Sequence, residues 1–156
     1  MHVLLTEASF GAADFLLQPL RDAGCLVSRC HSRAGLCRAL AVGGHCPLDE
    51  PFAQPDLVVD VRGREPEWTA REFGVVCAVR DHVPVALVSP DPDVRAEVPP
   101  GLENRVTVID VDGLLATCRC RLWSEARTSC SGGSPGATER GFCCKMAAGA
   151  AAGSRE

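Results

Sequence analysis

The sequence has few aromatic residues and almost no lysine. Its 156 residues include no tyrosine, two tryptophans and five phenylalanines, and Lys145 is the only lysine. A catalytic Tyr-x-x-x-Lys pair is therefore impossible. No apolar run approaches the roughly 20 residues that a membrane-spanning helix needs, so no membrane partner is expected. The opening stretch, MHVLLTEASFG, lacks a basic segment followed by a long apolar one, so we also expect no secretory signal.

Positive charge is in short supply as well. The chain has 16 basic and 20 acidic residues, which gives a net charge of −4 at pH 7. Nucleic-acid-binding proteins usually carry a clustered basic face, so no nucleic-acid partner is expected. The apolar fraction of 46% and the length suit an ordinary globular domain with a real core.

Cysteine, in contrast, is abundant, with ten residues. In a secreted chain this number would predict disulfides. Because we expect no export signal, we place the protein in the cytoplasm with reduced thiols. The usual role of a free cysteine is that of a small buried apolar residue.

Short apolar segments alternate with helical patterns along most of the chain. Helices are predicted over 10–24 and 68–82. This alternation is typical of α/β domains with a parallel sheet, so we predict a sheet of about five strands, Rossmann-like or flavodoxin-like. The predicted strands are 2–6, 25–30, 55–61, 83–89 and 104–111.

The character of the chain changes near its C-terminal end. A helix is expected to begin in 113–123, so we assign residues 1–123 to the α/β domain. Residues 124–156 contain turn formers, scattered charge and a run of small residues, with no period that could build a core. We therefore predict a low-complexity, disordered tail there. Out-of-frame reading of GC-rich DNA is the alternative origin of this segment.

The loop after the first strand is one candidate binding site. In open α/β sheets, ligands bind at the carboxyl ends of the strands. Backbone N–H groups at the start of the following helix attract anions such as phosphate. The candidate ligand-binding residues in this loop are Thr6, Ser9 and Gly11. The structural alternative is that Ser9 caps the helix and that Glu7 is solvated.

Residues 2–30, HVLLTEASFGAADFLLQPLRDAGCLVSRC, resemble the opening of the extended short-chain dehydrogenases and epimerases. That resemblance implies a nicotinamide cofactor held by a turn with three spaced glycines. Here Glu7 and Phe10 stand where small residues are needed, and only Gly11 remains. Nicotinamide-dependent catalysis is therefore not favoured.

Residues 55–89 contain a buried strand, a polar loop, a Thr-x-x-Glu-x-Gly entry into a helix and a Pro-Val strand. This order resembles the centre of the nucleoside 2-deoxyribosyltransferase family. The resemblance places the motif on Thr69, Glu72 and Gly74. It implies that Glu72 attacks the anomeric carbon of the sugar and that Asp60 is an acid/base or a sugar anchor. The family's Asp-x-Gly pair before the Thr is replaced by EPEW, and its Tyr-Leu-Ala-Gly-Pro-like N-terminal motif is missing.

A structural interpretation of the same motif is available. Thr69 at the N-cap and Glu72 at N3 have the spacing of a capping box, which satisfies two N–H groups at a helix start. Asp60 is the better site candidate, because the end of a central strand is rarely a structural place for a carboxylate. Arg62 beside it either neutralises Asp60 or binds an anion. Arg62 and Thr69 thus join the candidate ligand-binding residues.

The stretch CHSRAGLCRALAVGGHCPLD is a candidate metal site. Cys30, Cys37 and Cys46, with His31 and His45, supply enough ligands for zinc or iron. The paired Cys-x2–4-Cys knuckles typical of structural zinc are missing. The alternatives are ordinary packing of the cysteines, or a redox-active thiol at Cys46.

A broader resemblance covers residues 2–112, through the order RCH…C…CPLD…VVDVR…E-x-G-V-x-C-A-x-R…VPV. It is similar to small uncharacterised actinobacterial Rossmann-like proteins. The resemblance implies one compact α/β domain in the cytoplasm of a bacterium, and it implies no activity.

Three functions stay open at this point, and the sequence does not decide whether the protein is an enzyme. The first is an α/β domain that binds a small anionic or nucleotide-like ligand; it is favoured if Glu72 folds back on its own helix and the cysteines diverge. The second is a glycosyl-transferring or N-glycosidic enzyme, in which Glu72 faces a cleft with Asp60 nearby. The third is a metal- or redox-sensing protein, in which the sulfurs of Cys30, Cys37 and Cys46 converge. The oligomeric state is also open, although 67–82 offers a helix face for dimerisation.

Overall fold

The structure is a computed structural model, and it describes residues 1–31, 37–50, 53–64 and 67–130. The part of the predicted tail that spans 131–156 lies outside these residues. The helices are α1 (Asp14–Asp22), α2 (Phe73–Arg80) and α3 (Val111–Cys130), with short 3-10 turns η1 (Arg38–Leu40) and η2 (Ala70–Glu72). The strands are β1 (His2–Glu7), β2 (Leu26–Arg29), β3 (Leu57–Val61), β4 (Val85–Val88) and β5 (Thr107–Val108).

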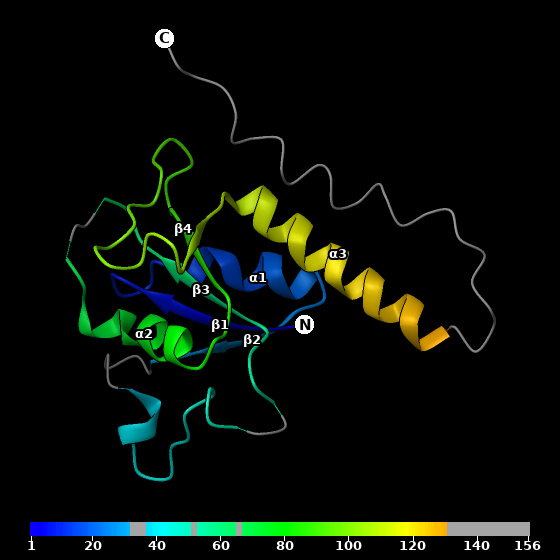
Figure 1. Ribbon diagram of the computed structural model, residues 1–156, viewed down its shortest axis with the longest axis horizontal. Coiled ribbons are helices and arrows are strands. Elements are labelled where there is room, and N and C mark those ends of the chain that lie inside the picture. The colour runs from blue at the N-terminus through cyan, green and yellow to red at the C-terminus, as the bar shows by residue number, and fades with distance from the viewer. Residues whose placement is uncertain (32–36, 51–52, 65–66, 131–156) are drawn as a thin grey trace.

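The strands form one parallel sheet in the order β2-β1-β3-β4-β5 (Figure 1). The prediction of a five-stranded parallel α/β fold is thus confirmed, and the order is the flavodoxin-like one rather than the Rossmann one. In this order the chain reverses its direction of travel across the sheet between β1 and β3. Thr6 and Asp60 are register partners at the carboxyl ends of these two strands.

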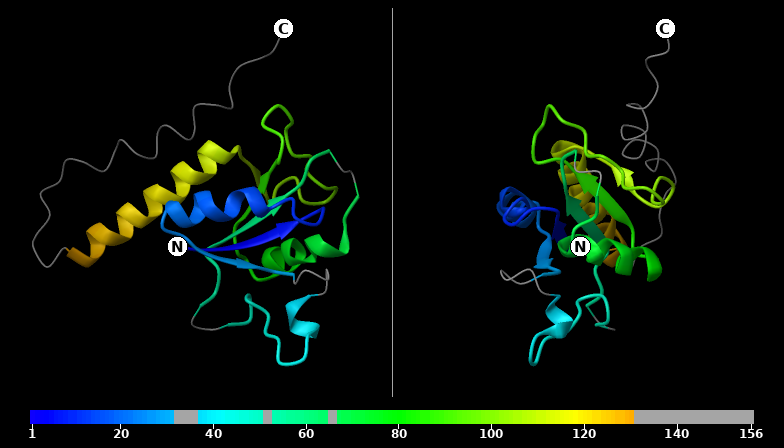
Figure 2. Two further views of the ribbon diagram at one scale, coloured as in Figure 1. Left: turned by 180° about the vertical axis from the view of Figure 1, so that it is seen from behind. Right: turned by 90° about the vertical axis from the view of Figure 1, so that its left-hand side faces the viewer.

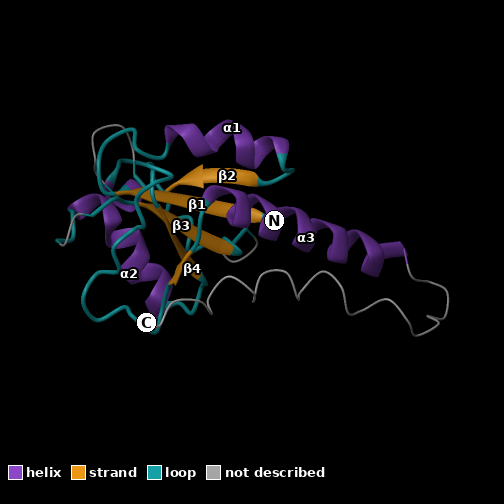
Figure 3. Cartoon of the chain, turned by 90° about the horizontal axis from the view of Figure 1, so that it is seen from above, coloured by secondary structure: helices purple, strands orange, loops and turns teal. Residues whose placement is uncertain are grey.

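Helices cover both faces of the sheet (Figures 2 and 3). Odd-numbered residues of β1, such as Val3 and Leu5, face α1 and α3, whereas Leu4 faces α2. The central strands are buried on both faces, which explains the apolar runs that they contain, 3–5, 57–59 and 85–88. The helices of the described residues include none that is long and apolar enough to cross a membrane.

The connections from β2 to β3 and from β4 to β5 contain little regular structure. The β4–β5 connection contains no helix, and its sequence is rich in proline. It covers the α2 face of the sheet with Ala96 and Val98 instead. β5 is only two residues long, whereas the sequence predicted a strand over 104–111.

Helix α3 is longer than the sequence predicted. The expected boundary between the domain and its tail lies at residue 123, but the helix runs through Cys130. Between Leu114 and Cys130 there is no glycine or proline to interrupt it. Leu114 and Cys118 anchor the helix to the core, and its C-terminal half projects beyond α1 (Figure 1).

Candidate functional site

Thr6 and Asp60 form a buried hydrogen bond where β1 meets β3. Thr6 Oγ1 donates to Asp60 Oδ1 over 2.7 Å, and neither residue is more than 2% exposed. Both are even-numbered positions of their strands, so they lie on the face of the sheet that α2 covers. The sequence selected both residues as site candidates, and the strand order brings them together.

The Asp60 carboxyl group is poised to hold a proton. Its pKa is raised from the ordinary 3.8 to about 7, mainly by burial and also by the negative charge of the neighbouring Glu72, against the lowering effects of Thr6 and Arg62. The second oxygen, Oδ2, is buried and receives no hydrogen bond from the described residues. A proton on Oδ2 therefore removes the charge repulsion between the carboxyl groups of Asp60 and Glu72 and makes their contact favourable.

Glu72 is held by three neighbours and has no exposed surface. Its Oε1 lies 2.9 Å from Nη1 of Arg62, and its Oε2 accepts a 2.7 Å hydrogen bond from the amide of Thr69. The capping box predicted for Thr69 and Glu72 is confirmed. Glu72 thus folds back on its own helix and lies beside Asp60. It has no exposed surface with which to face a cleft, as the second function requires.

Arg62 is the largest fully buried side chain of the described residues. Besides Glu72, its guanidinium lies 5.4 Å from the ring centre of Trp68 and donates to the carbonyl of Glu67 over 3.4 Å. From the sequence, we expected Arg62 either to neutralise Asp60 or to bind an anion. In the structure it is instead the counter-ion of Glu72, and its charge lowers the pKa of Asp60.

The loop after β1 differs from the prediction. Ser9 is exposed and caps no helix, since α1 begins only at Asp14 and its N-cap residue is Ala13. Glu7 is buried, not solvated, and its Oε2 accepts a 3.0 Å hydrogen bond from the Ala13 amide. An internal carboxylate thus occupies the helix start at which phosphate was expected. Gly11 supplies the left-handed turn between them, with φ of +80°.

Glu7 is also paired with Arg71 from η2. Nη2 of Arg71 lies 2.5 Å from Oε1 of Glu7. The guanidinium group of Arg71 also lies 5.2 Å from the ring centre of Phe10. Burial pushes the pKa of Glu7 upward, but hydrogen bonds from the Ala13 amide and from Arg71 outweigh it, and the net pKa is lowered. The Glu7–Arg71 pair was not predicted from the sequence, because its members are 64 residues apart.

A pocket opens beside this pair at the carboxyl ends of β1 and β2. Arg29 enters it from β2, where it forms an ion pair with Asp14 of α1. His31 enters with its Nδ1 atom buried and without a hydrogen-bond partner among the described residues. Burial lowers the pKa of His31, and the charge of Arg71 lowers it further. The lining residues are Leu5, Thr6, Glu7, Ala13, Arg29 and His31.

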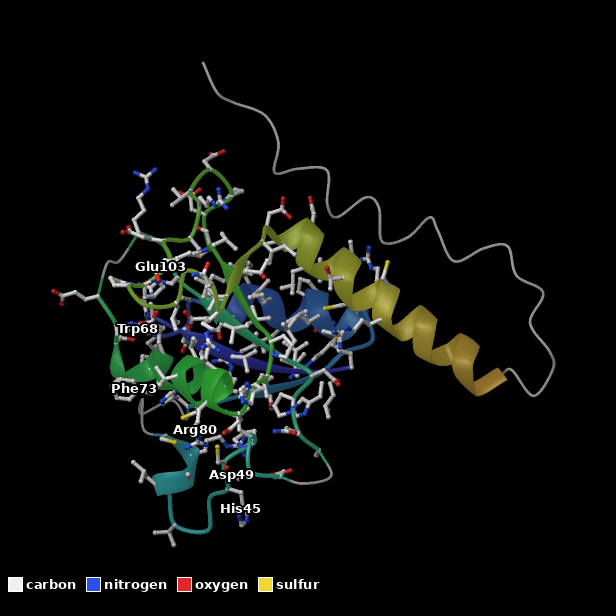
Figure 4. All side chains as sticks on the ribbon, in the orientation of Figure 1. His45, Asp49, Trp68, Phe73, Arg80 and Glu103 are labelled. Atoms are coloured by element: carbon white, nitrogen blue, oxygen red, sulfur yellow. The ribbon has the colours of Figure 1, made fainter. Side chains whose placement is uncertain are left out.

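The expected metal ligands do not form one coordination group. In the described part of the chain, no three or more His, Cys, Asp or Glu side chains are arranged to hold a metal ion. His31 belongs to the pocket, and His45 is exposed at the far end of its loop (Figure 4). Cys30 belongs to the apolar cluster on the α2 side of the sheet, and Cys46 and Cys77 pack against that cluster.

Gly74, the last residue of the Thr-x-x-Glu-x-Gly motif, has a packing role. A Cβ atom at this position would lie 2.7 Å from both Cys30 Sγ and Thr6 Cγ2. We expect Gly74→Ala to lower the free energy of unfolding by about 1–3 kcal/mol, because α2 must move away from the sheet. Urea denaturation measures this. The matched variant Gly101→Ala has open space around its Cβ but a φ of +89°, so a loss there reports backbone strain alone.

Comparison with known proteins gives no relative. No protein-family model, no curated protein sequence and no solved structure matches the chain.

Proposed function

We propose that the protein binds a small anionic or nucleotide-like ligand at the carboxyl ends of β1, β2 and β3. The observation that carries this proposal is the pocket beside the point where the strand order reverses. In open α/β sheets, this is the usual position of a ligand. Because one fold serves many functions, the position in the fold does not identify a ligand, and the side chains of the pocket must support the proposal.

The pocket offers donors suited to an anionic group. Arg29 is one-third exposed, and its ion-pair partner among the described residues is Asp14, a surface carboxylate that a ligand can displace. His31 adds a buried ring nitrogen that has no partner among the described residues. Phe10, 65% exposed, lies against Arg71 at the same edge and offers a flat apolar surface to a base. Because Glu7 occupies the helix start, the anionic group is expected at Arg29 and not at α1.

Calorimetric titration with inorganic phosphate, AMP, NAD⁺ and adenosine tests the proposal. A charged hydrogen bond contributes about 1.5–3 kcal/mol, so Arg29→Gln is expected to weaken binding of the best ligand about 10- to 100-fold. Arg80→Gln is the matched control, since Arg80 is an exposed arginine on α2 whose partner is Asp81. Equal affinities of the two variants, or no binding by any of the four compounds, would contradict the proposal.

Glycosyl transfer at the same edge is the second candidate. The observation that favours it is the proximity of Asp60 to Glu72, which that chemistry requires. It ranks second because both oxygens of Glu72 are engaged and the side chain is fully buried. Chromatography of the adenosine titration samples for free adenine decides this point: if no base is released, this candidate is wrong.

A further inference from the structure

His31 has an unsatisfied ring nitrogen beside the pocket at the carboxyl ends of β1 and β2. The residue lines this pocket and is only 8% exposed, and its Nδ1 atom is buried without a hydrogen-bond partner among the described residues. Buried polar atoms in folded proteins are nearly always hydrogen-bonded, so such an atom indicates a missing partner. A group that enters the pocket and bonds to the ring would be that partner.

The backbone places Arg29 and His31 on one side of the sheet. The pairing of β2 with β1 continues beyond Arg29, since the amide of Cys30 donates to the carbonyl of Leu5 over 3.0 Å. Side chains two residues apart on an extended chain point to the same face. Cys30, between Arg29 and His31, packs into the core on the α2 side, so its two neighbours project toward the α1 side. One group in the pocket can therefore meet a guanidinium and an imidazole.

The pocket is narrow, and this limits how much of a ligand can enter it. Three of its lining residues, Leu5, Thr6 and Ala13, are at most 2% exposed. The space that the centre of a water-sized atom can occupy is about 10 Å³, which is room for about one water molecule. One oxygen of an oxyanion fits there, but a whole phosphate group does not. The rest of such a ligand has to stay at the mouth, beside the one-third exposed Arg29.

The carboxylates at the pocket differ in how easily an anion can replace them. Glu7 is 7% exposed, and its oxygens are bound to the Ala13 amide and to Arg71, so its charge is already compensated. Asp14 is 62% exposed and is the ion-pair partner of Arg29. An incoming anion can therefore take the place of Asp14 on Arg29, while Asp14 turns to water. The Glu7–Arg71 pair stays intact.

The protonation of His31 is compatible with a bond to such an anion. Burial and the charge of Arg71 lower the pKa of His31, against the opposing effects of the Ala70 backbone and Glu7, so the ring is neutral at pH 7. A neutral imidazole has one N–H group, which either ring nitrogen can carry. An oxygen anion next to Nδ1 favours the form with the proton on Nδ1, and the ring then donates to it.

We propose that the pocket selects a terminal phosphate-type group, with one terminal oxygen accepting a hydrogen bond from Nδ1 of His31 and the others binding Arg29 in place of Asp14. This inference rests on the proposed function and narrows its ligand class to phosphate monoesters and inorganic phosphate. A bridging phosphate of a dinucleotide carries a chain on each side, and both chains have to leave through the mouth of the pocket. We therefore expect a bridging phosphate to lose the contact with His31.

Calorimetric titration of the full chain compares inorganic phosphate and AMP, which carry a terminal group, with NAD⁺, whose two phosphates are both bridging. AMP is expected to bind about 10- to 100-fold more tightly than NAD⁺, the effect of one hydrogen bond to a charged group. His31→Leu, which removes the ring nitrogens, should weaken AMP binding by the same factor and change NAD⁺ binding little. His45→Leu is the matched control, because His45 is exposed at the far end of its loop (Figure 4).

A measurement on the unaltered protein separates ligand contact from a structural role of His31. The ¹⁵N signal of Nδ1, assigned by correlation with the His31 backbone, should shift when AMP is added but not when adenosine is added, since adenosine lacks the phosphate. Equal affinities for AMP and NAD⁺, unchanged AMP affinity in His31→Leu or an unmoved Nδ1 signal at saturating AMP would overturn this inference. The proposed function would survive those results if Arg29→Gln still weakens AMP binding, whereas no binding of any compound would overturn both.

Discussion

Replacing Arg62 with alanine is expected to lower the free energy of unfolding by about 3–5 kcal/mol, which is the usual effect of removing one partner from a buried ion pair. Arg62 and Glu72 face each other 2.9 Å apart with no exposed side-chain surface. Without the guanidinium, Glu72 is left as an uncompensated buried charge next to Asp60. The variant also loses the contact with Trp68. Urea denaturation, followed by circular dichroism, measures the change.

Arg80→Ala is the matched control for this prediction. Arg80 forms an ion pair of similar length with Asp81, at 2.7 Å, but its side chain is 66% exposed. Exposed pairs contribute little to stability because water already solvates both charges, so this variant should be nearly neutral. Similar effects of the two substitutions would show that Arg62 does not act through its buried charge.

The strands were predictable because their signal is local. β1, β3 and β4 are buried on both faces, and each therefore contains at least three consecutive apolar residues. The strand order is not encoded locally, and it decides which residues meet. Asp60 could be selected as a residue that ends a central strand, but its partner Thr6 follows only from the pairing of β1 with β3.

The start of α1 shows why the first loop was predicted wrongly. Ser9 has the residue type of an N-cap, and the sequence offered no reason to reject it. The structure satisfies the amide of Ala13 with Glu7 instead, and this is possible because Arg71 compensates the buried carboxylate. The stabilising partner comes from a distant element, so local spacing could not reveal it. Glu7 did, however, carry the same signal as Asp60: a carboxylate at the end of a buried strand.

The capping box was the opposite case, since all its atoms belong to four consecutive residues. Thr69 and Glu72 form it as predicted. The sequence offered capping and catalysis as alternatives, yet the structure places the capping residue beside Asp60 and Arg62. A local pattern therefore predicted the conformation of Glu72 correctly, while its electrostatic environment depended on the packing of η2 against the sheet.

The titration of Asp60 gives the second large prediction. Its pKa of about 7 in the folded protein lies well above the ordinary 3.8, mainly because of burial. A group whose pKa is raised by folding stabilises the folded state fully below its unfolded pKa, and this stabilisation is lost as the pH rises to the folded pKa. The contribution of Asp60 should thus fall between about pH 4 and pH 7, by at most about 1.4 kcal/mol per pH unit.

Asp60→Asn removes this dependence while keeping the shape of the protonated side chain. The amide oxygen can accept from Thr6, as Oδ1 does, and the NH₂ group can donate toward Glu72. We therefore expect the variant to gain stability relative to the wild type as the pH rises from 5 to 8, by about 2–4 kcal/mol in total. Urea denaturation of both proteins at each pH measures the difference, in which the titrations of Glu7 and the other carboxylates cancel.

Asp93→Asn serves as the control, because Asp93 lies exposed in the loop after β4. Its difference from the wild type should stay constant over the same pH range. If the difference between Asp60→Asn and the wild type is equally flat, Asp60 is ionised throughout and does not share a proton with Glu72. The rising difference expected here would instead establish that Asp60 is protonated at pH 5, beside the ion pair of Glu72 with Arg62.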